Sequence, residues 1–176
     1  MKKLLTAATL LASIAFSNSA FALDACKVII CLGGNWKGYP ACVPDVREAL
    51  RDMAFGHSLP HCNTDRGGAP PPPGHVEANR ADNTPTNEDN CPVMYSRYSR
   101  RGDWAGCRFA GIVQVYVQGQ AWSDVFWDLH GDTSTRYYPD ALAQLPADMI
   151  DPTYDRDLAA CGRRRCEPPP ILGPAR

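Results

Sequence analysis

The most reactive side chains in this sequence are its eight cysteines, which could form disulfides, bind a metal ion or act as nucleophiles. An even number is expected of a disulfide framework in an oxidising compartment. No Cys-x-x-Cys spacing occurs, although that spacing marks thioredoxin-like oxidoreductases and most structural zinc sites. We therefore predict structural disulfides and no catalytic cysteine. The predicted disulfide residues are Cys26, Cys31, Cys42, Cys62, Cys91, Cys107, Cys161 and Cys166.

Carboxylates near aromatic rings form a second set of residues that could do chemistry. Paired carboxylates hydrolyse glycosidic bonds, and neighbouring aromatic rings could bind sugars. No Glu lies in an apolar run, where its pKa would be raised for acid catalysis. A periplasmic hydrolase acting on cell-wall glycan is therefore an alternative, and the main prediction is a chain that is not an enzyme. The residues concerned are Asp124, Asp128 and Asp132, with Trp122, Phe126 and Trp127.

Metal and cofactor sites have little support in the sequence. His57 and His61 have the spacing of ligands on one helix face, but Gly56 and Pro60 interrupt a helix there. No glycine-rich loop of the phosphate-binding type is present. We predict no metal and no cofactor, and we interpret the adhesion-like tripeptide at 101–103 as a chance match.

The first 22 residues have the features of a secretory signal. Lys2 and Lys3 precede an apolar run over 4–16, and the small-residue site at 20–22 predicts cleavage before Leu23. No later apolar stretch is long enough to span a bilayer. We expect a periplasmic protein with no transmembrane segment after signal removal. In a minor alternative, Cys26 would be lipidated, but this would leave an odd number of thiols.

The charge balance argues against a nucleic-acid partner. Without residues 1–22 the chain has 16 Lys and Arg against 19 Asp and Glu, a net charge of −3. A nucleic-acid binder needs a basic face to neutralise phosphates. The one run of three consecutive cations, 163–165, is interpreted as a solvated loop.

Residues 23–66 are predicted to form a helical hairpin. A first helix over 24–32 ends at Gly33-Gly34, and a second opens at Pro44-Asp45 and ends near Gly56. Asp45 and Glu48 have the spacing of a capping box. An apolar stripe along the second helix comprises Val46, Ala49, Leu50, Met53 and Ala54.

The helical geometry restricts the pairing of the first cysteines. Cys26 and Cys31 point roughly 140° apart on a helix that turns about 100° per residue. They should not pair together, so we expect each to join a different element. The predicted pairs are Cys31–Cys42 and Cys26–Cys62.

The rest of the chain is predicted to contain a linker, a β-hairpin region and a tail. Residues 67–90 are rich in Pro and Gly and are interpreted as a linker or long loop, 91–166 as a cysteine-tied region, and 167–176 as a Pro-rich tail. Alternating valines over 113–117 predict a strand, with 121–128 returning as its partner. A helical alternative for the return segment rests on Trp122, Val125, Phe126 and Leu129. A third strand near 135–138 and short helices over 140–145 and 155–161, the latter ended by Gly162, complete an α+β fold.

Aromatic residues in loops are the candidate interaction residues. Residues of this type are enriched at protein interfaces, although in a small disulfide-rich protein they could equally fill the core. The candidates are Trp36, Tyr39, Tyr95, Tyr98 and Trp104.

The N-terminal third combines Asp24-Ala25-Cys26, Cys31-Leu32, the glycine-rich loop, Cys42 with Pro44, the following helix and 59–62. With these features it resembles the TrbM family of conjugal transfer proteins. The resemblance covers about forty residues. It implies a periplasmic accessory role in plasmid transfer or mating-pair formation, with other envelope or type IV secretion proteins as partners and no catalytic residues. A secreted inhibitor or immunity-type binder is a further alternative.

Overall fold

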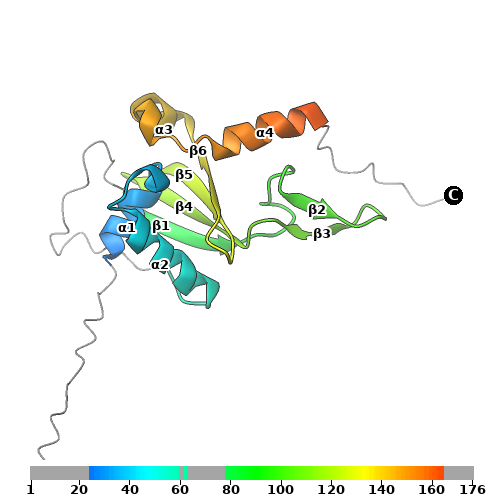
Figure 1. Ribbon diagram of the computed structural model, residues 1–176, viewed down its shortest axis with the longest axis horizontal. Coiled ribbons are helices and arrows are strands. Elements are labelled where there is room, and N and C mark those ends of the chain that lie inside the picture. The colour runs from blue at the N-terminus through cyan, green and yellow to red at the C-terminus, as the bar shows by residue number, and fades with distance from the viewer. Residues whose placement is uncertain (1–23, 60–61, 63–77, 165–176) are drawn as a thin grey trace, which may run out of the picture.

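Four antiparallel strands form the central sheet, in the spatial order β1-β4-β5-β6 (Figure 1). The structure is a computed structural model in which residues 24–59, 62 and 78–164 are described. The predicted signal peptide and the predicted tail therefore lie outside the described residues. Helices and sheet together confirm the predicted α+β class. The strands are β1 (Ala78–Pro85), β4 (Gly111–Val117), β5 (Gln120–Trp127) and β6 (Thr133–Tyr137).

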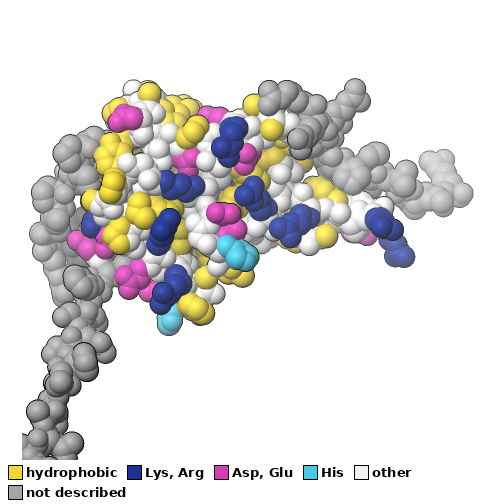
Figure 2. Space-filling view, in the orientation of Figure 1, with side chains coloured by type: hydrophobic (Ala, Val, Ile, Leu, Met, Phe, Trp, Pro, Cys, Tyr) yellow, Lys and Arg dark blue, Asp and Glu magenta, His cyan; other side chains and the backbone are white. Residues whose placement is uncertain are grey.

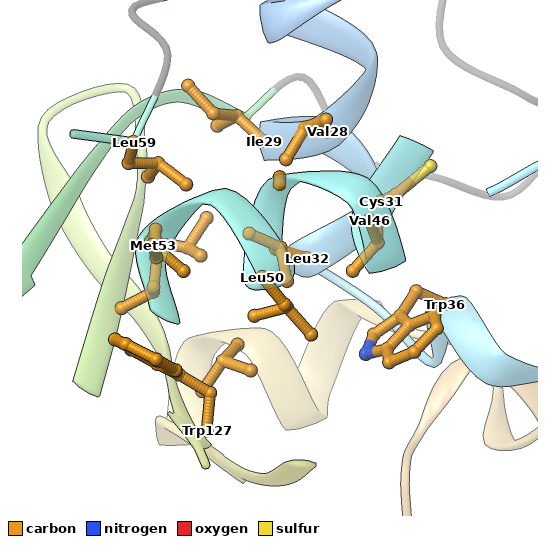
Figure 3. Packing of buried hydrophobic residues seen from close by; sticks show 14 of the residues in the cluster. Val28, Ile29, Cys31, Leu32, Trp36, Val46, Leu50, Met53, Leu59 and Trp127 are labelled. Carbon is orange, nitrogen blue, oxygen red and sulfur yellow. The ribbon is translucent and has the colours of Figure 1, made fainter. Parts of the chain in front are cut away.

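One face of the sheet packs against the N-terminal helices α1 (Ala25–Leu32) and α2 (Val43–Ala54) (Figure 1). Val113 and Val115 of β4 alternate with more exposed neighbours, as the period of two in a strand requires. They form one core with the buried stripe of α2 and with Trp127 (Figure 3). The helical hairpin and the sheet therefore share a single hydrophobic core.

The ends of α1 and α2 agree with the prediction except at the start of α2. Asp24 caps α1 by accepting hydrogen bonds from the backbone N–H groups of Cys26 and Lys27. Helix α2 begins at Val43, with Cys42 at its N-cap and no side-chain cap. The predicted capping box is wrong, because Asp45 lies inside the first turn and instead forms an ion pair with Lys27.

The disulfides confirm both predicted pairs. Cys26 bonds to Cys62 and Cys31 bonds to Cys42, with Cα atoms 4.4 Å and 5.7 Å apart. A third bridge joins Cys91 to Cys107. Cys161 is disulfide-bonded as well.

The predicted linker contains a strand. Residues 78–85 form β1, which pairs with β4 from Ala78↔Val117 to Pro85↔Gly111. We therefore correct the linker prediction for this part of 67–90; residues 67–77 lie outside the described residues. Strand β1 lies at the edge of the sheet, and Ala81 packs against the helical core. Its sequence is mostly polar and lacks the apolar alternation that marks a half-buried strand.

Strands β4 and β5 form the predicted hairpin, and the helical alternative for 121–128 is wrong. Gln118 and Gly119, both with positive φ (52° and 80°), make its tight turn. The pattern was ambiguous because β5 is covered on both faces. Val125 and Trp127 face α1 and α2, whereas Phe126 packs on the opposite side.

The second face of the sheet is partly covered by α4 (Thr153–Arg164) and the segment 86–110. Tyr154 of α4 stacks on Phe126, with ring centroids 5.8 Å apart. Helix α4 continues through Gly162, so the predicted helix end there is wrong, and residues 163 and 164 belong to the helix instead of a loop.

Helix α3 and two 3-10 turns complete the main body. Helix α3 (Pro139–Gln144) and the 3-10 turn η3 (Ala147–Met149) pack around Trp122. A second 3-10 turn, η1 (Trp36–Gly38), joins α1 to α2. No helix in the described ranges is long and apolar enough to cross a bilayer.

Candidate functional site

A two-stranded hairpin projects from the main body and carries three of the arginines (Figure 1). Strands β2 (Ser96–Tyr98) and β3 (Trp104–Cys107) pair in antiparallel register, and we call residues 96–107 the arginine hairpin. Its turn is held by Ser99, whose hydroxyl accepts hydrogen bonds from the backbone N–H groups of Arg101 and Asp103. The adhesion-like tripeptide 101–103 forms part of this turn.

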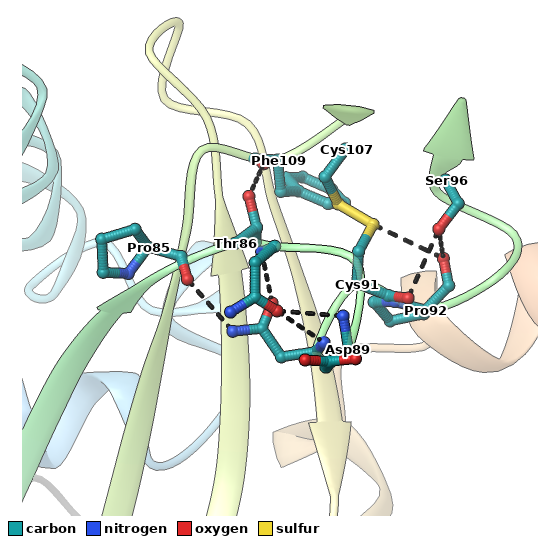
Figure 4. Close-up of a disulfide and its surroundings, with 10 residues drawn as sticks. Pro85, Thr86, Asp89, Cys91, Pro92, Ser96, Cys107 and Phe109 are labelled. Carbon is teal, nitrogen blue, oxygen red and sulfur yellow. Dashed lines mark hydrogen bonds between the residues drawn. A yellow bond between two sulfur atoms is a disulfide. The ribbon is translucent and has the colours of Figure 1, made fainter. Parts of the chain in front are cut away.

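The base of the arginine hairpin is fixed covalently. The Cys91–Cys107 disulfide joins the end of β3 to the chain just before β2 (Figure 4). Nearby, the hydroxyl of Thr86 donates a hydrogen bond to the carbonyl oxygen of Phe109 at 2.6 Å. This bond joins the chain just after β3 to the chain just after β1. The hairpin is therefore anchored on both of its strands.

Tyr95 anchors the hairpin instead of facing solvent. Its ring is 3 % exposed and packs edge-on against Phe109, with centroids 4.7 Å apart. Its hydroxyl bonds to Ser134 and donates to Asp157, at 2.7 and 3.1 Å. Burial raises the pKa of Tyr95 above its usual value. The prediction of Tyr95 as an interaction residue is corrected: an aromatic ring beside a disulfide fills the core here.

Trp36 is corrected in the same way. It is 3 % exposed and belongs to the core between α1, α2 and the sheet (Figure 3). Tyr39 is partly buried and packs against the same core. The loop between α1 and α2 therefore uses its aromatic rings for packing.

Tyr98 and Trp104 are the interaction candidates that remain partly accessible. They occupy paired positions on the two strands of the arginine hairpin and are each half-buried. Tyr and Trp side chains are enriched at protein interfaces. These two rings contribute to the accessible surface of the hairpin.

The arginines on and beside the hairpin were not among the predicted interaction residues. Arg97, Arg100 and Arg101 are exposed and form no ion pair with any acidic residue that the structure describes. Arg108, at the base, lies over the ring of Phe109 and within 3.9 Å of Asp157. Figure 2 shows Lys and Arg side chains at intervals from the body to the end of the hairpin. The sequence signal for this surface is the density of arginine between Cys91 and Cys107.

A hollow of about 350 Å³ lies where the hairpin meets the β5–β6 turn. Two arginines, Arg97 and Arg108, line it together with Asp128 and His130. Leu129 also lines the hollow and is 64 % exposed, although it is a large apolar side chain. Cationic and apolar groups thus lie side by side at the base of the hairpin.

Asp124, the first hydrolase candidate, is the centre of a hydrogen-bonded network on the second face of the sheet. Its carboxylate forms an ion pair with Arg136 and accepts hydrogen bonds from Gln114 and Tyr138, both at 3.1 Å. Burial lowers the pKa of the Arg136 guanidinium, but the hydrogen bond and charge of Asp124 raise it more, so it lies above its usual value. An open hollow of about 360 Å³ lies over this network.

The other two candidate carboxylates lie in the β5–β6 turn. Asp128 accepts hydrogen bonds from the backbone N–H groups of His130 and Asp132 at 2.8 and 2.9 Å. Its carboxylate therefore stabilises the turn. The candidate sugar-binding rings Trp122, Phe126 and Trp127 are all buried.

No group of three or more His, Cys, Asp or Glu side chains suited to a metal ion occurs within residues 24–59, 62 and 78–164. His57 is exposed after α2, and His61 lies outside these ranges.

No protein-family model matches the chain, and neither a curated protein nor a solved structure matches it.

Proposed function

We propose that this chain is an exported, disulfide-rich accessory protein of plasmid conjugal transfer, acting in the periplasm by contact with other envelope or type IV secretion proteins. The assignment to conjugation rests on the resemblance of the N-terminal segment to the TrbM family. The mode of action rests on the arginine hairpin.

The arginine hairpin is the observation that carries a contact function. It projects from the body, is anchored by the Cys91–Cys107 bridge, and presents arginines and aromatic rings that are enriched at protein interfaces. A rigid element loses little conformational entropy when a partner binds. An ordered surface of this kind is suited to binding another protein.

The disulfides support export. Structural disulfides persist in oxidising compartments and are rare in the cytoplasm, where thiols are kept reduced. Three bridges join described residues, and two of them close the segment that resembles the TrbM family.

The candidate carboxylates do not favour the alternative hydrolase. A retaining or inverting glycosidase needs two carboxyl groups facing one bond. Asp124 lies on the second face of the sheet, bound by Arg136, whereas Asp128 is engaged in the β5–β6 turn. The two carboxylates thus serve separate structural roles.

Deletion of the gene from a donor plasmid tests the proposal. We expect transfer to fall to near background and the wild-type gene supplied in trans to restore it. Sensitivity to a pilus-dependent phage, measured on the same strains, separates a defect in pilus assembly from a later defect. Unchanged transfer and unchanged phage sensitivity would refute the conjugation role.

A further inference from the structure

We infer that the arginine hairpin and the hollow at its base dock an acidic segment of a partner protein, one rich in Asp and Glu with an apolar side chain among them. This inference rests on the proposed contact function and adds the chemistry of the partner.

Uncompensated positive charge is the first observation. Arg97, Arg100 and Arg101 are exposed and have no acidic partner among the described residues. Arg108 adds a fourth guanidinium at the base, where Asp157 and Asp132 lie 3.9 and 4.0 Å from it. Guanidinium groups bind carboxylates through paired hydrogen bonds.

The charge of the hairpin is opposite to that of the remaining chain. The hairpin (96–107) and Arg108 at its base contain four arginines and one aspartate, a net charge of +3, in a chain of net charge −1. All other residues together therefore carry −4. The positive surface is a local feature, which is suited to one acidic partner segment.

The hollow at the base of the hairpin would bind the apolar side chain of the partner segment. Leu129 is 64 % exposed beside the apolar wall formed by Phe109 and Ala110. An apolar side chain placed here would bury Leu129, while neighbouring carboxylates reach Arg97 and Arg108. Phosphate polymers offer no such side chain.

Three features favour a protein over a nucleic acid or an anionic membrane. Asp103 stands among the arginines of the turn, Asp128 lines the hollow, and the rest of the chain is negative. A continuous array of phosphates would be repelled by these charges. Separate carboxylates can be placed between them.

The test uses the exported, disulfide-bonded full chain and a labelled synthetic peptide rich in Glu that contains two leucines. Binding is followed by fluorescence anisotropy, and we expect it to weaken as salt rises from about 50 to about 300 mM, because exposed charges are screened. Arg97→Glu/Arg101→Glu should weaken binding about tenfold or more. The matched control is Arg47→Glu/Arg51→Glu, which changes two exposed arginines of α2 by the same net charge.

Each outcome decides the inference. Loss of binding in the hairpin variant alone supports it, once non-reducing peptide mapping shows native disulfides. Absence of binding, or equal loss in both variants, overturns it. Equally tight binding of duplex DNA or of phosphatidylglycerol vesicles through Arg97 and Arg101 overturns the assignment to a protein partner.

Failure of the inference and failure of the proposed function remain distinguishable. If the hairpin variant no longer binds the acidic peptide but transfers plasmid normally, the docking surface stands and its role in conjugation is wrong. If gene deletion abolishes transfer but the peptide does not bind, the proposed function stands and this docking surface is wrong.

Discussion

Trp122 and Gly33 are joined by a hydrogen bond in which the indole Nε1 donates to the carbonyl oxygen at 2.9 Å, although 89 residues separate them. Gly33 is the C-cap of α1, where helix carbonyls lack partners within the helix. The bond therefore fastens the stapled N-terminal helix to β5.

Trp122→Phe should destabilise the protein. The substitution keeps most of the buried ring but leaves the Gly33 carbonyl unsatisfied, at a cost of about 1–3 kcal/mol. Urea unfolding gives the free energy. Trp104→Phe is the matched control, because Trp104 Nε1 has no hydrogen-bond partner among the described residues. Equal losses in the two variants would contradict the proposed role of the bond.

Gly111→Ala should also destabilise the protein, because β4 and β5 approach closely there. A Cβ atom at Gly111 would lie 2.7 Å from Nε1 of Trp127, whose indole donates to Asn83 at 3.0 Å. Overpacking of this kind costs about 1–3 kcal/mol. The measurement is the shift in the thermal unfolding midpoint.

Gly162→Ala serves as its control. This glycine lies within α4 and a Cβ atom there meets nothing within 4 Å. Alanine is the better helix former, so we expect a gain of about 0.5–1 kcal/mol. A stable Gly111→Ala variant would show that Trp127 can move.

Much of this arrangement could be predicted from the sequence, because local periodicity is a strong signal where one face is buried. The 100° rotation per residue separated Cys26 from Cys31 and led to the correct pairs. Strand β1 was missed because its outward side chains are polar and it lies at a sheet edge. Edge pairing depends on a distant partner strand, which local composition does not reveal.

The contact surface could be predicted only in part. Aromatic type alone does not separate Tyr95, which is buried by Phe109, from Tyr98, which is half exposed. The difference arises from tertiary packing against β6 and α4. The exposure of Arg97, Arg100 and Arg101 likewise depends on tertiary structure, because β2 and β3 project from the body (Figure 1).

Asp124 and Arg136 should be energetically coupled. Arg136→Met would leave a buried carboxylate without its counter-charge, and we expect the free energy of unfolding to fall by about 1–3 kcal/mol. This loss is smaller than that expected for a fully buried ion pair, because Arg136 is partly exposed. In Asp124→Asn/Arg136→Met the loss should be smaller than the sum of the single losses. Additive losses in urea unfolding would show that the pair is not coupled.

Stability should decrease in alkaline solution because of buried tyrosines. Burial, with the charge of Asp151, raises the pKa of Tyr137 above its ordinary value of 10.0, and burial likewise raises that of Tyr95. The unfolded chain then loses these protons first, so stability is full below about pH 10 and falls as pH rises further. Urea unfolding at rising pH, with tyrosinate absorbance as the probe, measures this. A smaller alkaline loss in Tyr137→Phe is expected, and an unchanged loss would exclude Tyr137 as a source.

Plasmid transfer from donors that lack the gene tests the central claim most directly. Each donor carries in trans either no copy, the wild-type gene, the Arg97→Glu/Arg101→Glu variant or the Arg47→Glu/Arg51→Glu variant. We predict that the wild type and the α2 variant restore transfer, whereas the hairpin variant leaves it near the level without a copy. Equal transfer from all four donors would contradict a contact role in conjugation.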